Sequence, residues 1–389
     1  AGTEQYNIPT VLCKRVGVSQ WYYGKEALKN QGEEGILVDH LLEKALQGEE
    51  VLVEDATFDP VALLTLFIKR SLATLNMQVS LNRAEVFMFT VEELTPRMVE
   101  VLGKVVSGLQ LKCSQICFQS HIESFYYYML HQQAELWKRE VFVFEYNEEL
   151  KTLRFQCNRH TTPKVVFIEH LDYPEMRRVA WSEDESERMA QKQGLDEQFG
   201  QLCGSCLQGT DVSTVFLIGE GFKEGWTRES LKILCHNRRV FQGNNLYSKG
   251  ACYAGMEKLE PQGGTREYVY LGEDKLKSNI GMKALRRGED SYLAILDAGV
   301  NWYEAKTDFD LILESGNVLC FTITPLTGEN IMDKTITLDG LPERPRCTTR
   351  LRIHAEMTAI HTLTLEITDM GFGELFKSSG RAWTHTLQV

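Results

Sequence analysis

The distribution of hydrophobic positions divides the chain into two parts with different periodicity. Up to about residue 258, short apolar runs alternate with segments whose apolar residues recur every three or four positions. Strands that alternate with helices of ten or more residues predict an α/β domain with a largely parallel sheet. From residue 268 onward, several runs alternate apolar and polar residues as half-buried antiparallel strands do. The pattern therefore predicts an α/β part followed by an all-β sandwich at 268–389.

The first part contains a regular series of predicted elements. A proline follows Asp59 where an apolar helical pattern begins, and proline is favoured in the first turn of a helix. The charged stretch 182–193 is predicted as either an exposed helix or a loop, and 35–47 as an amphipathic segment. Further helices are predicted at 24–30, 95–107, 121–133 and 226–235. Strands are predicted at 8–14, 20–23, 50–54, 84–91, 115–119, 164–169 and 239–241, with a hairpin of 140–146 and 150–157.

A glycine turn lies within the most informative stretch of the chain, 215–255. The run VFLI at 215–218 predicts a buried strand, and Gly219-Glu220-Gly221 follows it directly. Two short elements then lead to a small-residue helix that contains Gly250-Ala251. Backbone N–H groups at a junction of strand, glycine turn and helix can approach a phosphate or a ring. A single Gly-x-Gly is nevertheless more often only a tight turn.

Composition and charge exclude several classes of function. The 389 residues are enough for two or three domains, and the net charge of −12 argues against binding to nucleic acid or to an anionic membrane. The ten cysteines are spread singly, which is typical of reduced thiols in the cytosol. No apolar run approaches the roughly 18 residues of a membrane span, and we expect no signal peptide. We expect a cytoplasmic protein without a nucleic-acid or membrane partner.

The first part of the chain resembles the seventy-kilodalton heat-shock chaperones and, more distantly, the actin and sugar-kinase superfamily. The segments IPTVL at 8–12 and YYGKEALKN at 22–30 resemble that family's proline-entered strand and its Gly-x-x-Ala helix start. The stretch 215–255 resembles the segment that carries the family's adenosine-binding glycines. This resemblance implies an actin-like, ribonuclease-H-type domain with one lobe at 1–139 and a second, reduced lobe at 140–258.

The C-terminal part resembles the substrate-binding β-domain of the same chaperones. The sequence from 336 to 375 begins ITLDGLPERPR, and in the family a strand likewise leads into Asp/Thr-Gly-Leu/Ile-Pro-x-x-Pro-Arg and then into two antiparallel strands. A Pro- and Gly-bearing linker at 257–267 separates this part from the first. The resemblance covers nearly the whole chain in the same domain order. We expect the nearest relatives in a bacterial family of chaperone-like proteins.

The parts of the family that bind phosphate and hydrolyse ATP are missing or altered in this sequence. No Asp-x-Gly-Thr hairpin precedes the first strand, and the family's second phosphate loop is replaced by EYNEE at 145–149. Side chains obstruct the close backbone approach that glycine permits, and each glutamate repels a phosphate by about 4 kcal/mol at 4 Å and an effective dielectric of 20. Leu28 stands where the family has its catalytic lysine, and 169–214 is too short for the family's large insert.

Other candidate chemistry is weak. Cys203 and Cys206 have the C-x-x-C spacing of a redox pair or half a zinc site, but no second pair is present, so ordinary thiols are expected. No spacing of serine, histidine and carboxylates indicates a catalytic or metal site. In the C-terminal part, Trp302-Tyr303 and Trp383 either line an apolar peptide groove or pack into the core.

Two functional hypotheses remain for the whole chain. The first is a chaperone-like protein-binding module without ATP hydrolysis or cofactor, in which the C-terminal sandwich binds a protein or peptide segment by strand addition. The second is an ATP-dependent chaperone or nucleotide switch whose phosphate-binding hairpin lies outside this chain. In that case ATP or ADP with Mg would bind, and Gly219, Glu220 and Gly221 are the candidate cofactor-binding residues. A filament-forming protein of the superfamily is a third, less favoured possibility.

Overall fold

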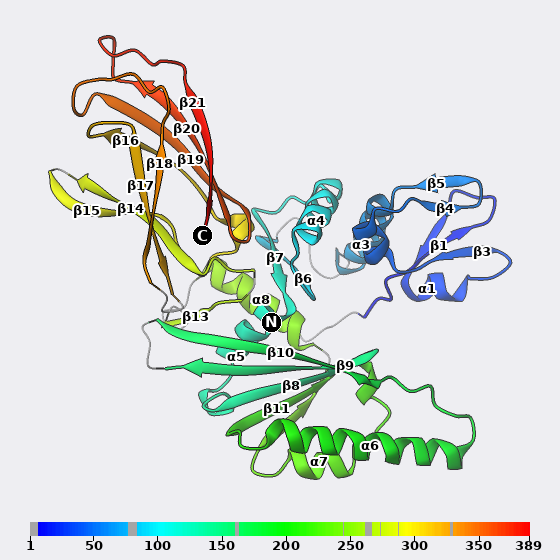
Figure 1. The fold of residues 1–389 in the computed structure, drawn as a ribbon. Coiled ribbons are helices and arrows are strands. Elements are labelled where there is room, and N and C mark those ends of the chain that lie inside the picture. Colours follow the sequence, from blue (N-terminus) through cyan, green and yellow to red (C-terminus); the bar gives the residue numbers. More distant parts are fainter. Residues whose placement is uncertain are drawn as a thin grey trace. The chain divides into compact units, whose positions relative to one another are not determined.

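A computed structural model describes residues 7–76, 84–159, 163–243, 245–260, 267–272, 274–286, 288–326 and 330–389 (Figure 1). The chain forms two compact units. The first comprises Ala1–Gln156 and Ile168–Arg266, and the second Cys157–Phe167 and Glu267–Val389. The fold is mixed α/β with a strand-rich C-terminal part, as expected from the change in periodicity. None of the described helices is long and apolar enough to cross a membrane.

The first unit begins with two small antiparallel sheets and the helices that cover them. In one sheet β1 (Leu12–Arg15) lies between its two neighbours, and the other is a hairpin. Apolar side chains from β1, β3, α2, α3 and α4 share one hydrophobic core. The remaining elements of this region are β2 (Trp21–Tyr23), α1 (Gly24–Lys29), β3 (Gly35–Val38), α2 (Leu41–Gln47), β4 (Val51–Val53), β5 (Ala56–Phe58) and α3 (Pro60–Asn76).

A parallel strand pair follows, with a helix after each strand. β6 (Val86–Val91) pairs in parallel with β7 (Gln115–Ser120), and α4 (Pro96–Leu109) connects them. The helix α5 (His121–Leu130) begins directly after β7, because the Ser120 hydroxyl accepts a hydrogen bond from the Glu123 N–H at 3.1 Å. The helices predicted at 95–107 and 121–133 are confirmed, with ends shifted by two or three residues.

The largest sheet has six strands in the order β12-β11-β8-β9-β10-β13. β11 is parallel to both β8 and β12, whereas β9 is antiparallel to β8, as the predicted hairpin requires. β10 is likewise parallel to β13, so the sheet is mixed, with parallel pairs in the majority as the periodicity predicted. Its strands are β8 (Glu140–Tyr146), β9 (Glu149–Asn158), β10 (Lys164–Arg177), β11 (Val212–Ile218), β12 (Arg239–Gln242) and β13 (Tyr268–Tyr270).

The charged stretch 182–193, predicted as either a helix or a loop, lies mostly in helix α6 (Glu185–Leu207). The Asp184 carboxylate accepts a hydrogen bond from the Glu187 N–H at 2.9 Å and so caps its first turn. Buried residues begin only at Leu195, so its first three turns have no apolar face against the core. Asp196 of the same helix accepts three backbone N–H groups at the start of α7 (Glu229–Leu234).

The helix α8 (Leu246–Leu259) packs against α5 and β6 within the first unit. A Cβ atom on Gly250 would lie 1.8 Å from the Ser124 carbonyl oxygen, so only glycine allows the two helices to approach this closely. The linker predicted at 257–267 begins later than expected, because α8 continues to Leu259, and residues 261–266 lie outside the described residues. The division of the chain before residue 258 into two lobes remains a prediction.

The second unit is built from two antiparallel sheets of four strands. Their orders are β15-β14-β17-β18 and β16-β19-β20-β21, and strands of both sheets contribute to one hydrophobic cluster. Trp302 belongs to this cluster and is only 7% exposed, so it packs in the core instead of lining a groove. The strands are β14 (Ser278–Arg286), β15 (Glu289–Leu296), β16 (Lys306–Leu313), β17 (Val318–Pro325), β18 (Met332–Thr337), β19 (Thr349–Ala359), β20 (Thr362–Gly371) and β21 (Ala382–Gln388).

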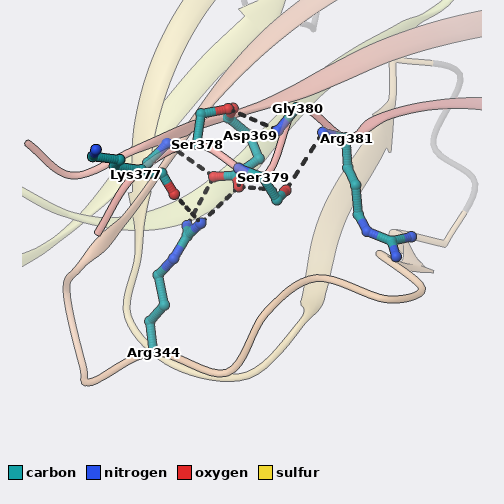
Figure 2. Close-up of polar contacts among 8 residues, drawn as sticks. Arg344, Asp369, Lys377, Ser378, Ser379, Gly380 and Arg381 are labelled. Carbon is teal, nitrogen blue, oxygen red and sulfur yellow. Dashed lines mark hydrogen bonds and ion pairs between the residues drawn. The ribbon is translucent and has the colours of Figure 1, made fainter. Parts of the chain in front are cut away.

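A buried ion pair holds the segment that carries the two-proline motif. Figure 2 shows Arg344 donating two hydrogen bonds to Asp369, at 2.8 Å and 2.7 Å. Asp369 is fully buried and also accepts hydrogen bonds from the N–H and hydroxyl of Ser379. The Arg344 guanidinium holds the pKa of Asp369 well below its usual range. The motif therefore fastens the loop before β19 to the end of β20.

Candidate functional site

Ionisable residues of the first unit gather where its parallel strands end. Glu92 follows β6, His121 follows β7, Glu145 is near the end of β8 and Glu220 follows β11. β6 and β7 form one sheet, and β8 and β11 belong to another. In each sheet the parallel strands end at the same edge, and ligands of open α/β sheets bind at such edges. The N-terminal turn of α8 adds Tyr247 to this group.

A carboxylate, a phenol and an imidazole are in direct contact at this edge. The Tyr247 hydroxyl donates a hydrogen bond of 2.6 Å to Glu145 Oε2. The His121 ring stacks on the Tyr247 ring, with centroids 4.2 Å apart and planes 9° from parallel. Because these three residues come from β8, α8 and α5, the packing of α8 on α5 determines their geometry.

Burial shifts the proton affinities of all three groups. It raises the pKa of Glu145, although the hydrogen bond from Tyr247 acts in the opposite direction. It lowers the pKa of His121 to about 4, so the imidazole is neutral at pH 7. Burial and the neighbouring Glu145 raise the pKa of Tyr247 well above its ordinary value. Perturbed proton affinities of this kind are concentrated at functional sites, although structural networks produce them too.

An ion pair adjoins the cluster. Lys151 of β9 pairs with Glu92, the residue after β6. Burial opposes the charged form of both groups, but their mutual attraction prevails, lowering the pKa of Glu92 and raising that of Lys151. The Glu92 charge in turn adds to the rise in the pKa of Glu145. The Lys151 ammonium therefore pairs with Glu92. Among the hydrogen bonds of the described residues, Glu145 has no basic partner.

The predicted turn residues lie beside this cluster. Gly219 precedes the short 3-10 helix Glu220–Phe222, and the Glu220 N–H donates a hydrogen bond of 3.2 Å to the Asn147 side chain. Asn147 in turn donates to Glu145 Oε1 at 3.0 Å. The structure thus brings Glu220 together with the segment 145–149 that replaces the second phosphate loop.

Tyr146 fills the space on the inner side of the glycine turn. A Cβ atom on Gly219 would lie 2.3 Å from the Tyr146 carbonyl oxygen, and one on Gly221 would lie 2.4 Å from the Tyr146 ring. Gly219 also has a φ of 103°, which only glycine adopts readily. The ring is 1% exposed and packs against Phe222 and Trp226. Both glycines are therefore needed for packing against Tyr146.

The sequence missed His121, Tyr247, Glu92 and Lys151 as members of the site. No sequence motif identifies these residues, but the positions of three of them relative to the predicted elements could have indicated the site. Glu92 and His121 each follow a predicted strand, and Tyr247 opens the helix after the glycine turn. Among the described residues, no group of three or more His, Cys, Asp or Glu side chains is arranged to hold a metal.

Residues 1–273 match the description "Family of unknown function (DUF5716) C-terminal". The chain belongs to this family. Every residue of the candidate site lies within the part that matches the DUF5716 family. Residues 275–389, which contain both four-stranded sheets, match "Domain of unknown function (DUF8552)". No curated protein matches the chain.

Proposed function

We propose that the chain is a chaperone-like protein-binding module whose actin-like part does not hydrolyse ATP. The observation that carries the proposal is the packing of Tyr146 against Gly219 and Gly221. In the heat-shock chaperones that the sequence resembles, this turn faces the nucleotide. Here the packing of both glycines on the buried Tyr146 accounts for them without a ligand, so they are no longer a sign of a nucleotide site.

The strand order supports the actin-like assignment of the region from Glu140 to Gln242. With β8 as the first strand, β9 and β10 follow on one side, and β11 and β12 lie on the other side and run parallel to β8. The helices α6 and α7 form the crossovers. A three-stranded meander extended by two parallel strands is the arrangement that we expect for one actin-like lobe.

Charge at the site supports the absence of ATP hydrolysis. Glu92, Glu145 and Glu220 surround the strand ends, where Lys151 pairs with Glu92 and Lys223 pairs with Glu220. The backbone amide of Glu220, which would otherwise be available to an anion, donates to Asn147. A polyphosphate at this edge would meet carboxylates where a phosphate loop needs open N–H groups.

The second unit supplies a surface for an extended peptide. We infer that its two sheets form a β-sandwich of the substrate-binding kind, with β18 as the accepting edge. The Leu338 N–H donates to the Asn317 carbonyl at 2.8 Å, and hydrogen-bonded pairs alternate along an antiparallel ladder. The backbone groups of Asp333, Thr335 and Thr337 therefore point away from β17, as strand addition requires. Ile331, which is 64% exposed, provides apolar surface beside this edge.

Free thiols support a reducing location for such a module. All ten cysteines are unpaired with one another, including Cys203 and Cys206 of α6. Disulfides are rare in the cytoplasm because its thiol systems keep cysteines reduced. We therefore place the protein in the cytoplasm.

Binding of short peptides rich in leucine and valine to the full chain tests the proposal. We expect saturable binding by fluorescence anisotropy and slower amide exchange in β18. Thr335→Pro removes an outward N–H without breaking a bond to β17, and should weaken binding about tenfold. Thr335→Val keeps the N–H and serves as the control. Absence of binding, or equal affinity of the two variants, would contradict the assignment of the edge.

A further inference from the structure

A cavity of about 270 Å³ lies between two strands in the N-terminal region of the first unit. Residues 36–38 of β3 and residues 51–53 of β4 line it. Side chains alternate between the two faces of a strand, so consecutive residues border one space only along the strand's edge. The cavity therefore follows the edges of both strands, which lie in the blue region of Figure 1.

The edge of β3 that borders the cavity has unpaired backbone groups. Among the described strands, β3 pairs only with β1. The Val16 N–H donates to the Glu34 carbonyl at 3.0 Å, and the ladder continues with Cys13 opposite Leu37. Because hydrogen-bonded pairs alternate, the N–H and C=O of Leu37 point away from β1.

The edge of β4 has the same property. In the described part of the chain β4 pairs only with β5, through a hairpin whose two-residue turn joins Val53 to Ala56. The pair that flanks such a turn is hydrogen-bonded, so the next pair, Leu52 and Thr57, is not. The backbone groups of Leu52 thus point away from β5, and its side chain is 70% exposed.

The free charge beside the cavity is negative. Glu49, Glu50 and Lys44 complete its lining. The Lys44 ammonium donates to the Asp39 carbonyl at 2.7 Å and to the Asp39 carboxylate at 3.0 Å. Within the described residues no ion pair involves Glu49 or Glu50. A segment that binds here is favoured by a lysine or arginine close to these two carboxylates.

We propose that this cavity is a docking groove for an extended segment of a partner protein. The segment adds as a strand between β3 and β4 and bonds to the backbones of Leu37 and Leu52. Its apolar side chains pack beside the Leu52 side chain, and a basic residue lies next to Glu49 and Glu50. The groove belongs to the first unit, so it does not depend on peptide binding by β18 of the second unit.

The test uses short fluorescent peptides in which valine and threonine alternate around one central lysine, glutamate or alanine. We expect the full chain to bind the lysine peptide most tightly at low salt, by fluorescence anisotropy. Leu52→Pro should weaken this binding about tenfold, because proline removes a donor at the groove. Thr57→Pro is the matched control, since the Thr57 N–H points to the opposite edge of the same hairpin. It should leave the affinity unchanged.

A charge-reversal variant provides an independent test, because it leaves the strands undisturbed. Glu49 and Glu50 are both exposed, so their joint replacement by lysine should leave the fold intact and transfer the preference to the glutamate peptide. Weak binding of all three peptides, or equal loss in Leu52→Pro and Thr57→Pro, overturns the proposal. Self-association of the chain that Leu52→Pro abolishes would also overturn it, because the occupant would then be a second copy.

Discussion

Glu145, Tyr247 and His121 are in contact at the strand ends, and the buried His121 should make the stability of the fold depend on pH. A histidine whose pKa is lower in the folded protein than in the unfolded chain favours folding only while it is neutral. The folded state should therefore lose stability as the pH falls from about 6.5 to about 4. The loss is up to about 3 kcal/mol, because one pKa unit corresponds to about 1.4 kcal/mol.

His121→Phe should remove this pH dependence. Phenylalanine keeps a ring for stacking on Tyr247 but carries no ionisable group. Denaturant unfolding of the variant should show a smaller decrease in the free energy of unfolding between pH 7 and pH 4 than the parent protein. His236→Phe, at an exposed position, is the control and should retain the decrease. Equal slopes for the parent and His121→Phe would show that the pKa of His121 is the same in the folded and unfolded states.

Breaking the Arg344–Asp369 pair should greatly destabilise the second unit. Arg344→Ala leaves the fully buried Asp369 carboxylate without its cation, which costs about 3–5 kcal/mol. The lowered pKa of Asp369 means that the contribution is present above the pKa of about 4 in the unfolded chain and is lost as the pH falls below it.

The exposed pair of Arg352 with Asp310 in the same unit provides the control for that change. Arg352→Ala should alter the unfolding midpoint in urea very little, because solvent screens exposed ion pairs. Equal effects of Arg344→Ala and Arg352→Ala on the midpoint would refute the structural role assigned to the buried pair.

At the scale of elements, the approach of α8 to α5 depends on one glycine. Gly250→Ala places a methyl group against the Ser124 carbonyl, and the helices must separate at a cost of about 1–3 kcal/mol. The separation should also lengthen the hydrogen bond between Tyr247 and Glu145. Gly204→Ala in α6 is the matched control, since its Cβ meets no atom within 4 Å. It should stabilise the protein by about 0.5–1 kcal/mol in the same urea titration.

The sequence predicted most elements where an apolar pattern was present and failed where it was absent. The strands β6, β7, β8 and β11 and the helices α3, α4 and α5 follow the hydrophobic periodicity. The first turns of α6 do not pack on the core, so periodicity left 182–193 undecided, although Asp184 is a capping residue. The segment 35–47 proved to be a strand and a helix, because His40 adopts a left-handed φ of 49° between them.

The candidate site was only partly accessible from the sequence. The glycine turn and the replaced loop at 145–149 were identified, because glycine and its substitution are visible locally. The contact of His121 with Tyr247 depends on how α5 and α8 pack, and no local pattern encodes a pairing across so many residues. The filling of the turn by Tyr146 likewise follows only from the spatial neighbourhood of β8 and β11.

At the scale of the whole molecule, the first unit has an acidic edge where its parallel strands end, and the second unit has two antiparallel sheets with a common core. Among the strands that the structure describes, each unit has edges without a partner strand, at β3 and β4 in the first and at β18 in the second. We therefore propose that the molecule binds extended peptides and not a nucleotide.

Thermal unfolding of the full chain with and without Mg-ATP tests this account most directly. A ligand at one hundred times its Kd stabilises a protein by about 2.7 kcal/mol, which is readily seen as a rise in Tm. We predict no change in Tm at millimolar Mg-ATP, because the segment 145–149 has no glycines and carboxylates lie beside the glycine turn. A saturable rise in Tm that Gly221→Ala removes would contradict the account and favour a nucleotide switch.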